Sequence, residues 1–282
     1  MYPAIDNCCS LSVAPPARTP ITKTVHFRSF SALAAAAVLW TTTSESLPCQ
    51  TNPSATAPWP SVHQTNGWYG NIYEQPLTGS FGLMTDIQWR RSGLVEHPKQ
   101  LFMVGGLSWR ATPGVRLTLG GGYVASAPYG LLPALLPSRE YQIWYQLQLQ
   151  QHAGPLDFAH RYRYENRWIH DVIHDASGEH SSETRFAHRL RYQLRASHPF
   201  GVKLHGQPIL AIAADEAFVG MTAAEKRVSF DQNRASVGIG LPLGRGERLE
   251  VSYMQQWIAN TRLKTSEINN TLLVMFVHNL AR

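Results

Sequence analysis

The chain has 282 residues, of which 16% are charged and 10% aromatic, and its formal net charge is +6. This length allows one large or two small domains, and the charge content is low for a soluble domain. The positive charge comes mainly from arginines that alternate with aromatic and aliphatic residues, without a lysine-rich run. This distribution argues against nucleic acid as a partner.

The three cysteines, Cys8, Cys9 and Cys49, all precede the patterned body of the chain. No disulfide can therefore cross-link that body, and no CxxC metal site is present. Residues 47–66 are rich in Pro, Ser and Thr and predict a disordered linker, with Cys49 leaving lipidation as an alternative. The folded body is expected over residues 67–282.

The first 46 residues have the organisation of an export signal. Basic residues precede an apolar run over residues 30–40, and small polar residues follow it as far as Ser46. An apolar run of this length is too short to cross a bilayer as a helix. Residues 1–46 therefore predict an N-terminal extension followed by a secretory signal peptide.

The clearest structural pattern lies between Thr184 and Ser197. Odd positions in this stretch are mostly arginine, and even positions are almost all apolar or aromatic. Successive side chains of a β-strand point to opposite faces, so one face would be a ladder of arginines and the other apolar. A membrane barrel turns its apolar face to lipid and its polar face to a wet interior. A soluble sandwich would have to bury the apolar face, and a secreted β-sandwich that binds a partner stays open as an alternative.

The two-residue period continues through the body and predicts eleven strands. They are expected over residues 68–75, 80–91, 100–110, 115–126, 140–151, 156–169, 184–197, 207–219, 230–241, 248–258 and 269–277. Most are longer than the globular average of about 5–6 residues and close to the roughly 9–11 that cross a bilayer when tilted. Tryptophans near the strand ends predict aromatic girdles at the membrane interfaces: Trp68, Trp89, Trp109, Trp168 and Trp257.

Short and long connections alternate along the chain, as they do between the two ends of an outer-membrane barrel. The fold class predicted is therefore all-β, an antiparallel up-and-down transmembrane β-barrel of 10–12 strands. Single-chain bacterial barrels usually have an even number of strands. Residues 80–277 would complete a ten-stranded barrel, which leaves residues 68–75 as a surplus strand. That strand would have a further partner strand, lie in the lumen or pair only partly, and the sequence leaves these alternatives open. Three adjacent glycines, Gly120, Gly121 and Gly122, predict a bend that lets the barrel curve.

Four segments carry a family resemblance. Residues 160–168 (HRYRYENRW), 189–195 (RLRYQLR), 230–240 (FDQNRASVGIG) and 249–257 (LEVSYMQQW) resemble the bacterial family catalogued as domain of unknown function 2490. The resemblance covers about residues 68–277 and implies a β-barrel in the cell outer membrane of a Gram-negative bacterium. It implies no activity. We expect outer-membrane lipids, lipopolysaccharide and the barrel-assembly machinery as the partners of such a barrel.

Alternation places a group of charged side chains on the inner face of the predicted barrel, where they would form a polar network. Its predicted members are Arg161, Arg163, Glu165, Arg167, Arg185, Arg189, Arg191, Arg195 and Arg234. In a narrow barrel such side chains fill the interior, so a network of Arg–Glu pairs that closes the lumen is the favoured hypothesis. An anion-selective passage or a site for acidic solutes is the alternative.

The segment from His170 to His180 combines three histidines with three carboxylates. Its spacing fits no defined zinc motif, so we expect a polar outer loop, with no metal and no cofactor. His180 and Ser182 have the His-x-Ser spacing of outer-membrane lipid hydrolases, in which a histidine activates a serine. They are weak catalytic candidates because no orienting partner is evident, and the protein is expected to be a structural or solute-permeable barrel rather than an enzyme.

Overall fold

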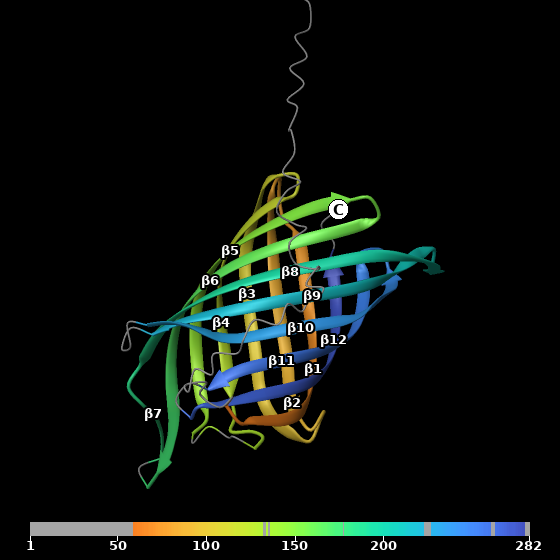
Figure 1. The fold of residues 1–282 in the computed structure, drawn as a ribbon. Helices are drawn as coiled ribbons and strands as arrows, with labels where there is room; N and C mark the ends of the chain where they lie inside the picture. The colour runs from red at the N-terminus through yellow and green to blue at the C-terminus, as the bar shows by residue number, and fades with distance from the viewer. Residues whose placement is uncertain are drawn as a thin grey trace, which may run out of the picture. The chain divides into compact units, whose positions relative to one another are not determined.

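The computed structural model describes residues 59–131, 134, 136–176, 178–222, 227–260 and 263–279. The predicted signal peptide and most of the predicted linker lie outside these residues. Figure 1 shows the described part as a barrel of tilted strands. Within it, no helix is long and apolar enough to cross a membrane.

The described residues form twelve strands, eleven of which make up the barrel wall. The wall strands are β1 (Ser61–Pro76), β2 (Phe81–Ser92), β3 (His97–Thr112), β4 (Val115–Ser126), β5 (Ser138–Ala153), β6 (Leu156–Asp175), β8 (Arg185–Leu204), β9 (Gln207–Thr222), β10 (Arg227–Gly244), β11 (Glu247–Asn260) and β12 (Thr265–Asn279). Each overlaps one predicted strand. The predicted class, an all-β barrel of 10–12 strands, is confirmed.

Closure of the wall explains the odd number of strands. Consecutive wall strands pair antiparallel, and β1 pairs with β12 in parallel from Ser61↔Ser266 to Glu74↔Asn279. The first strand is therefore a full member of the wall and not a surplus segment. The predicted antiparallel arrangement holds for every neighbouring pair except at the seam of β1 with β12, because an up-and-down wall with an odd number of strands can close only in parallel.

The first strand begins at Ser61, six residues ahead of the boundary that composition predicted. Residues 61–66 contain little apolar surface, but the backbone of β12 supplies hydrogen-bonding partners along this whole stretch. Inside the barrel, Asn66 Nδ2 donates to Asn269 Oδ1 at 2.7 Å, and both residues are fully buried. Pairing with a strand about 200 residues away in sequence therefore overrides a local composition typical of a linker.

Part of the segment predicted as a polar loop is an extension of a strand. The strand β6 continues to Asp175, and the short strand β7 (Gly178–Ser181) folds back onto residues 172–175. This hairpin projects beyond the wall in Figure 1, because β6 pairs with β8 only as far as Ile169↔Arg185.

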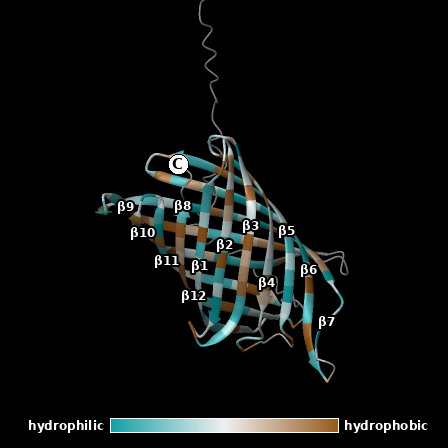
Figure 2. Ribbon diagram, turned by 180° about the vertical axis from the view of Figure 1, so that it is seen from behind, coloured by the Kyte–Doolittle hydropathy of each residue, from teal (hydrophilic) through white to brown (hydrophobic). Residues whose placement is uncertain are grey.

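The two faces of the wall differ as the alternation predicted. On β2, Phe81, Leu83, Ile87 and Trp89 are 40–48% exposed, whereas Asp86, Gln88 and Arg90 are at most 9% exposed. Figure 2 shows hydrophobic and hydrophilic residues alternating along the strands. The outer face thus carries large apolar side chains in open contact with the surroundings, and polar side chains are packed inside.

One side of the interior nevertheless has an apolar core around Trp144, which is fully buried. It packs with Met84, Phe102, Val104 and Val124. Trp144 has the same strand parity as Gln142 and Gln146, so it points inward although it is aromatic.

Glycines facing this ring make room for it. A Cβ atom at Gly120 would lie 2.2 Å from Trp144 Cζ2, and one at Gly106 would lie 2.9 Å from Trp144 Cη2. The indole Nε1 donates to the backbone oxygen of Gly121 at 3.3 Å. The glycine run predicted as a bend therefore serves to admit a flat ring against the wall.

Candidate functional site

The centre of the barrel interior is built around Trp68, which is 3% exposed. The guanidinium carbon of Arg90 lies 3.9 Å from its ring centroid, and that of Arg234 lies 4.8 Å away. The prediction that Trp68 belongs to an interface girdle is therefore wrong. Trp68 shares its parity with Gln64 and Asn66, and that side of β1 faces inward.

A second ring repeats this arrangement on another part of the wall. The guanidinium carbons of Arg234 and Arg191 lie 4.5 and 4.7 Å from the centroid of Phe218, and Arg90 also stacks on Phe102 at 4.7 Å. Planar guanidinium groups and aromatic rings therefore alternate across the interior. We call this set the cross-barrel layer: Trp68, Arg90, Phe102, Arg191, Phe218 and Arg234.

Glu216 joins the arginines of three strands. Its carboxylate lies 2.9 Å from Arg161 Nη2, 2.8 Å from Arg191 Nη2 and 3.8 Å from Arg234 Nη1. Arg191 Nη1 also pairs with Glu165 at 2.7 Å. Both carboxylates are almost fully buried. Buried charges are tolerated when they are paired and hydrogen-bonded, and this cluster satisfies both conditions.

Other inward arginines bind partners on adjacent or more distant strands of the wall. Arg167 donates to both Glu140 oxygens at 2.6 Å, the bidentate geometry for which guanidinium is suited. Further pairs join Arg189 to Asp231 at 2.9 Å, Arg195 to Glu250 at 2.7 Å and Arg163 to Gln146 at 2.7 and 2.9 Å.

The structure brings eight of the nine residues of the predicted network together in the interior. The ninth, Arg185, has an exposed side chain that pairs with Asp171 at 2.8 Å. It is the first residue of β8, at the rim from which the β6–β7 hairpin projects. The predicted network did not include Glu216 or Phe218, although both occupy alternate positions of β9 that face inward. Trp68 was predicted to lie on the outer face.

Two cavities adjoin the cross-barrel layer. Five of its six members, all except Phe218, line both of them. The loop-side cavity, of about 190 Å³, lies toward the end of the barrel where β2 meets β3 and β4 meets β5. The turn-side cavity, of about 430 Å³, lies toward the opposite end and includes the Arg195–Glu250 pair and Arg116, which is 2.7 Å from Glu74.

The connection after β4 contributes Tyr129 to the loop-side cavity. Its hydroxyl donates to Glu267 of β12 at 3.1 Å, so this connection reaches toward the far side of the wall. Burial and the adjacent negative charge of Glu267 raise the pKa of Tyr129 above its ordinary value. The phenol therefore stays protonated and keeps donating to the carboxylate. Lys99 Nζ lies 4.0 Å from the centroid of the same ring.

The two catalytic candidates bind different partners. Ser182 Oγ accepts a hydrogen bond from the backbone nitrogen of Asp171 at 2.8 Å and donates to the backbone oxygen of Glu183 at 3.1 Å. His180 Nε2 lies 3.7 Å from Asp175 Oδ2. The serine proton is thus directed to a carbonyl rather than to a base. Among the described residues, no three His, Cys, Asp or Glu side chains are grouped to hold a metal ion.

No curated protein and no solved structure matches this chain. A family model matches residues 65–267, which run from β1 into β12. This span holds all four segments that carried the resemblance and most of the barrel wall. The chain therefore belongs to the family described as Protein of unknown function (DUF2490).

Proposed function

We propose that this chain is an outer-membrane β-barrel protein with a structural role, whose lumen is closed to the passage of solutes. The cross-barrel layer supports this proposal, because its stacked rings and guanidinium groups project into the interior from several strands and line both cavities. In this reading the outer face contacts outer-membrane lipids and lipopolysaccharide, and the barrel-assembly machinery inserts the protein.

The apolar outer face supports a lipid environment. Large side chains such as Ile143 and Tyr145 on β5 and Leu117 and Leu119 on β4 are 41–55% exposed on neighbouring strands. A contiguous apolar surface of this kind is a liability in water and is stabilised in a bilayer. The polar groups of the wall backbone are paired around the whole ring, as a membrane interior requires.

The energetics of the layer support a closed lumen. Moving Arg191 aside would leave Glu165 and Glu216 buried with fewer partners, and breaking a buried ion pair costs about 3–5 kcal/mol. Moving Arg90 or Arg234 would also remove a stacking contact with Trp68. Thermal fluctuations at the scale of RT therefore do not open a continuous path.

Conductance in planar lipid bilayers tests the closed lumen. The refolded protein is expected to insert without producing stable single-channel steps across a range of voltages. A reproducible open-channel conductance in the unmodified protein would contradict the proposal.

A variant that removes the two central rings, Trp68→Ala with Phe218→Ala, should connect the cavities and make liposomes permeable to small solutes. The matched control is Trp89→Ala, which removes an exposed ring on the outer face and should leave the liposomes sealed. Equal permeability of the two variants would mean that the cross-barrel layer does not form the barrier.

A further inference from the structure

The loop-side cavity concentrates positive charge. Its lining holds six cations and two carboxylates: Arg90, Lys99, Arg167, Arg189, Arg191 and Arg234 against Glu140 and Glu165. The two carboxylates are already engaged, since Glu140 accepts both hydrogen bonds of Arg167 and Glu165 pairs with Arg191. The carboxylates of the lining are therefore not available to pair with the remaining cations of the lining.

Lys99 is a buried cation without a hydrogen-bonded counter-charge in the described structure. It is 5% exposed, and among the described residues its Nζ has no hydrogen-bond acceptor. Its contact is with the face of the Tyr129 ring. The nearby carboxylate of Glu267 accepts hydrogen bonds from Tyr129 at 3.1 Å and from Asn269 at 2.7 Å. A buried ammonium without a hydrogen-bonded counter-charge is unfavourable, so an anion entering the cavity would be stabilised.

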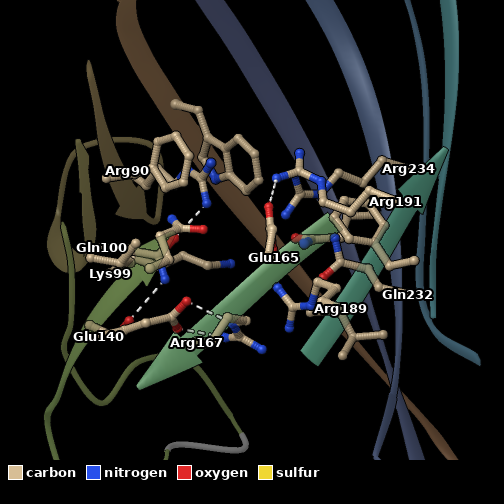
Figure 3. A pocket seen from close by; sticks show the side chains of 18 of the residues that line it. Arg90, Lys99, Gln100, Glu140, Glu165, Arg167, Arg189, Arg191, Gln232 and Arg234 are labelled. Atoms are coloured by element: carbon tan, nitrogen blue, oxygen red, sulfur yellow. Dashed lines mark hydrogen bonds and ion pairs between the residues drawn. The ribbon is translucent and has the colours of Figure 1, made fainter. Parts of the chain in front are cut away.

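One more donor, on Arg189, is open toward the same space, and Arg90 adds a cation whose hydrogen-bond partners are neutral. Arg189 Nε is buried without an acceptor within the described part of the chain. Arg90 donates to the amide oxygens of Gln88 and Gln100, which carry no charge. Figure 3 shows Lys99 and Arg189 reaching toward the cavity from different parts of the wall.

We propose that the loop-side cavity is a binding site for a small oxyanion, the carboxylate or phosphate group of a solute. Lys99 and Arg189 supply the open donors, and Arg90 supplies further positive charge beside the aromatic rings. A cavity of about 190 Å³ accepts a small solute and not a polymer. The site depends only on the interior of the folded barrel, so it stands independently of membrane location and of whether the lumen conducts.

The test uses the full refolded barrel in detergent micelles at constant ionic strength. Inorganic phosphate and succinate are titrated separately by isothermal calorimetry, with sodium chloride as the control for ionic strength. Saturable binding of at least one oxyanion at one site per barrel is expected, without saturable binding of chloride. Absence of saturable binding of both oxyanions overturns the proposal.

Variants at Lys99 locate the site. Lys99→Met removes the charge at similar volume and should weaken binding about tenfold or more, since a hydrogen bond to a charged group is lost. Lys99→Arg keeps the charge and should retain most of the affinity. Because Lys99→Met also removes a buried charge that has no hydrogen-bond acceptor on the described residues, it is expected to fold at least as well as the parent in anion-free buffer.

The matched control lies in the turn-side cavity. Arg248→Gln removes a partly exposed cation whose partner Glu250 keeps Arg195. It should leave the affinity for the oxyanion within about twofold of the parent, because Arg248 lies on the other side of the cross-barrel layer from the proposed site. Binding that is unchanged in Lys99→Met, or weakened equally in Arg248→Gln, would show that the anion binds elsewhere or without a site and would overturn the proposal.

Discussion

At the scale of single residues, the indole of Trp144 packs closely against the glycines of β3 and β4. Gly120→Ala would bring a methyl group to within 2.2 Å of the indole, so the ring or the strand must shift. Overpacking of this kind costs about 1–3 kcal/mol. We expect a lower urea midpoint for Gly120→Ala, measured by tryptophan fluorescence in lipid vesicles.

The neighbouring glycine is the control for that experiment. A Cβ atom at Gly121 would lie 3.5 Å from Gln142 O, an ordinary contact. Gly121→Ala should therefore change the free energy of unfolding by less than about 0.5 kcal/mol. Equal destabilisation by the two substitutions would show that flexibility of the glycine run, and not space for Trp144, is what this position needs.

Residue-level reasoning from the sequence predicted which face a charged side chain occupies, but not its partner. Strand alternation alone places Arg161 and Arg191 on the inner face. Their shared contact with Glu216 depends on the register between three strands, which no local pattern fixes. Trp68 was misplaced because an aromatic residue near a predicted strand end fits both an interface girdle and a stacking platform for arginine.

At the scale of elements, the β6–β7 hairpin is peripheral to the wall. The pairs between β7 and residues 172–175 are separate from the wall pairs between β6 and β8. Replacing residues 173–180 with a short Gly-Ser turn loses one exposed ion pair that joins this segment to the wall, Arg139–Glu179, worth at most about 1 kcal/mol. We expect the shortened protein to fold and to unfold at nearly the parent temperature, measured by circular dichroism.

Deletion of β1 is the opposite case. It removes Trp68 from the cross-barrel layer and exposes the backbone edges of β2 and β12. This variant should fail to give a folded band on an unheated gel. If the β1 deletion folds and the protein with the shortened hairpin does not, the hairpin and not β1 is the element that the wall requires.

The sequence predicted the existence and order of the wall strands because long alternation is a strong local signal. Their ends were predicted less well. The strand β8, for example, continues to Leu204, about seven residues past the predicted end, because pairing with β9 sustains it where the alternation has stopped. No local sequence pattern indicates that β1 and β12 pair in parallel, because either strand could equally pair with an antiparallel neighbour.

At the scale of the whole molecule, continuous pairing around the wall predicts cooperative and slow unfolding. No strand edge of the wall is left open among the described residues, so denaturation must break the ring as a unit. The purified protein should migrate differently on a gel with and without heating, and it should require detergent to stay monodisperse. A monomer that remains soluble after complete removal of detergent would contradict the proposed membrane location.

The parallel seam has a consequence for sidedness. In an even-stranded barrel the wall starts and finishes at the same rim, whereas here Ser61 and Asn279 lie at opposite rims. A binding partner that recognises the first residues of the wall and one that recognises the last must therefore approach the barrel from opposite ends.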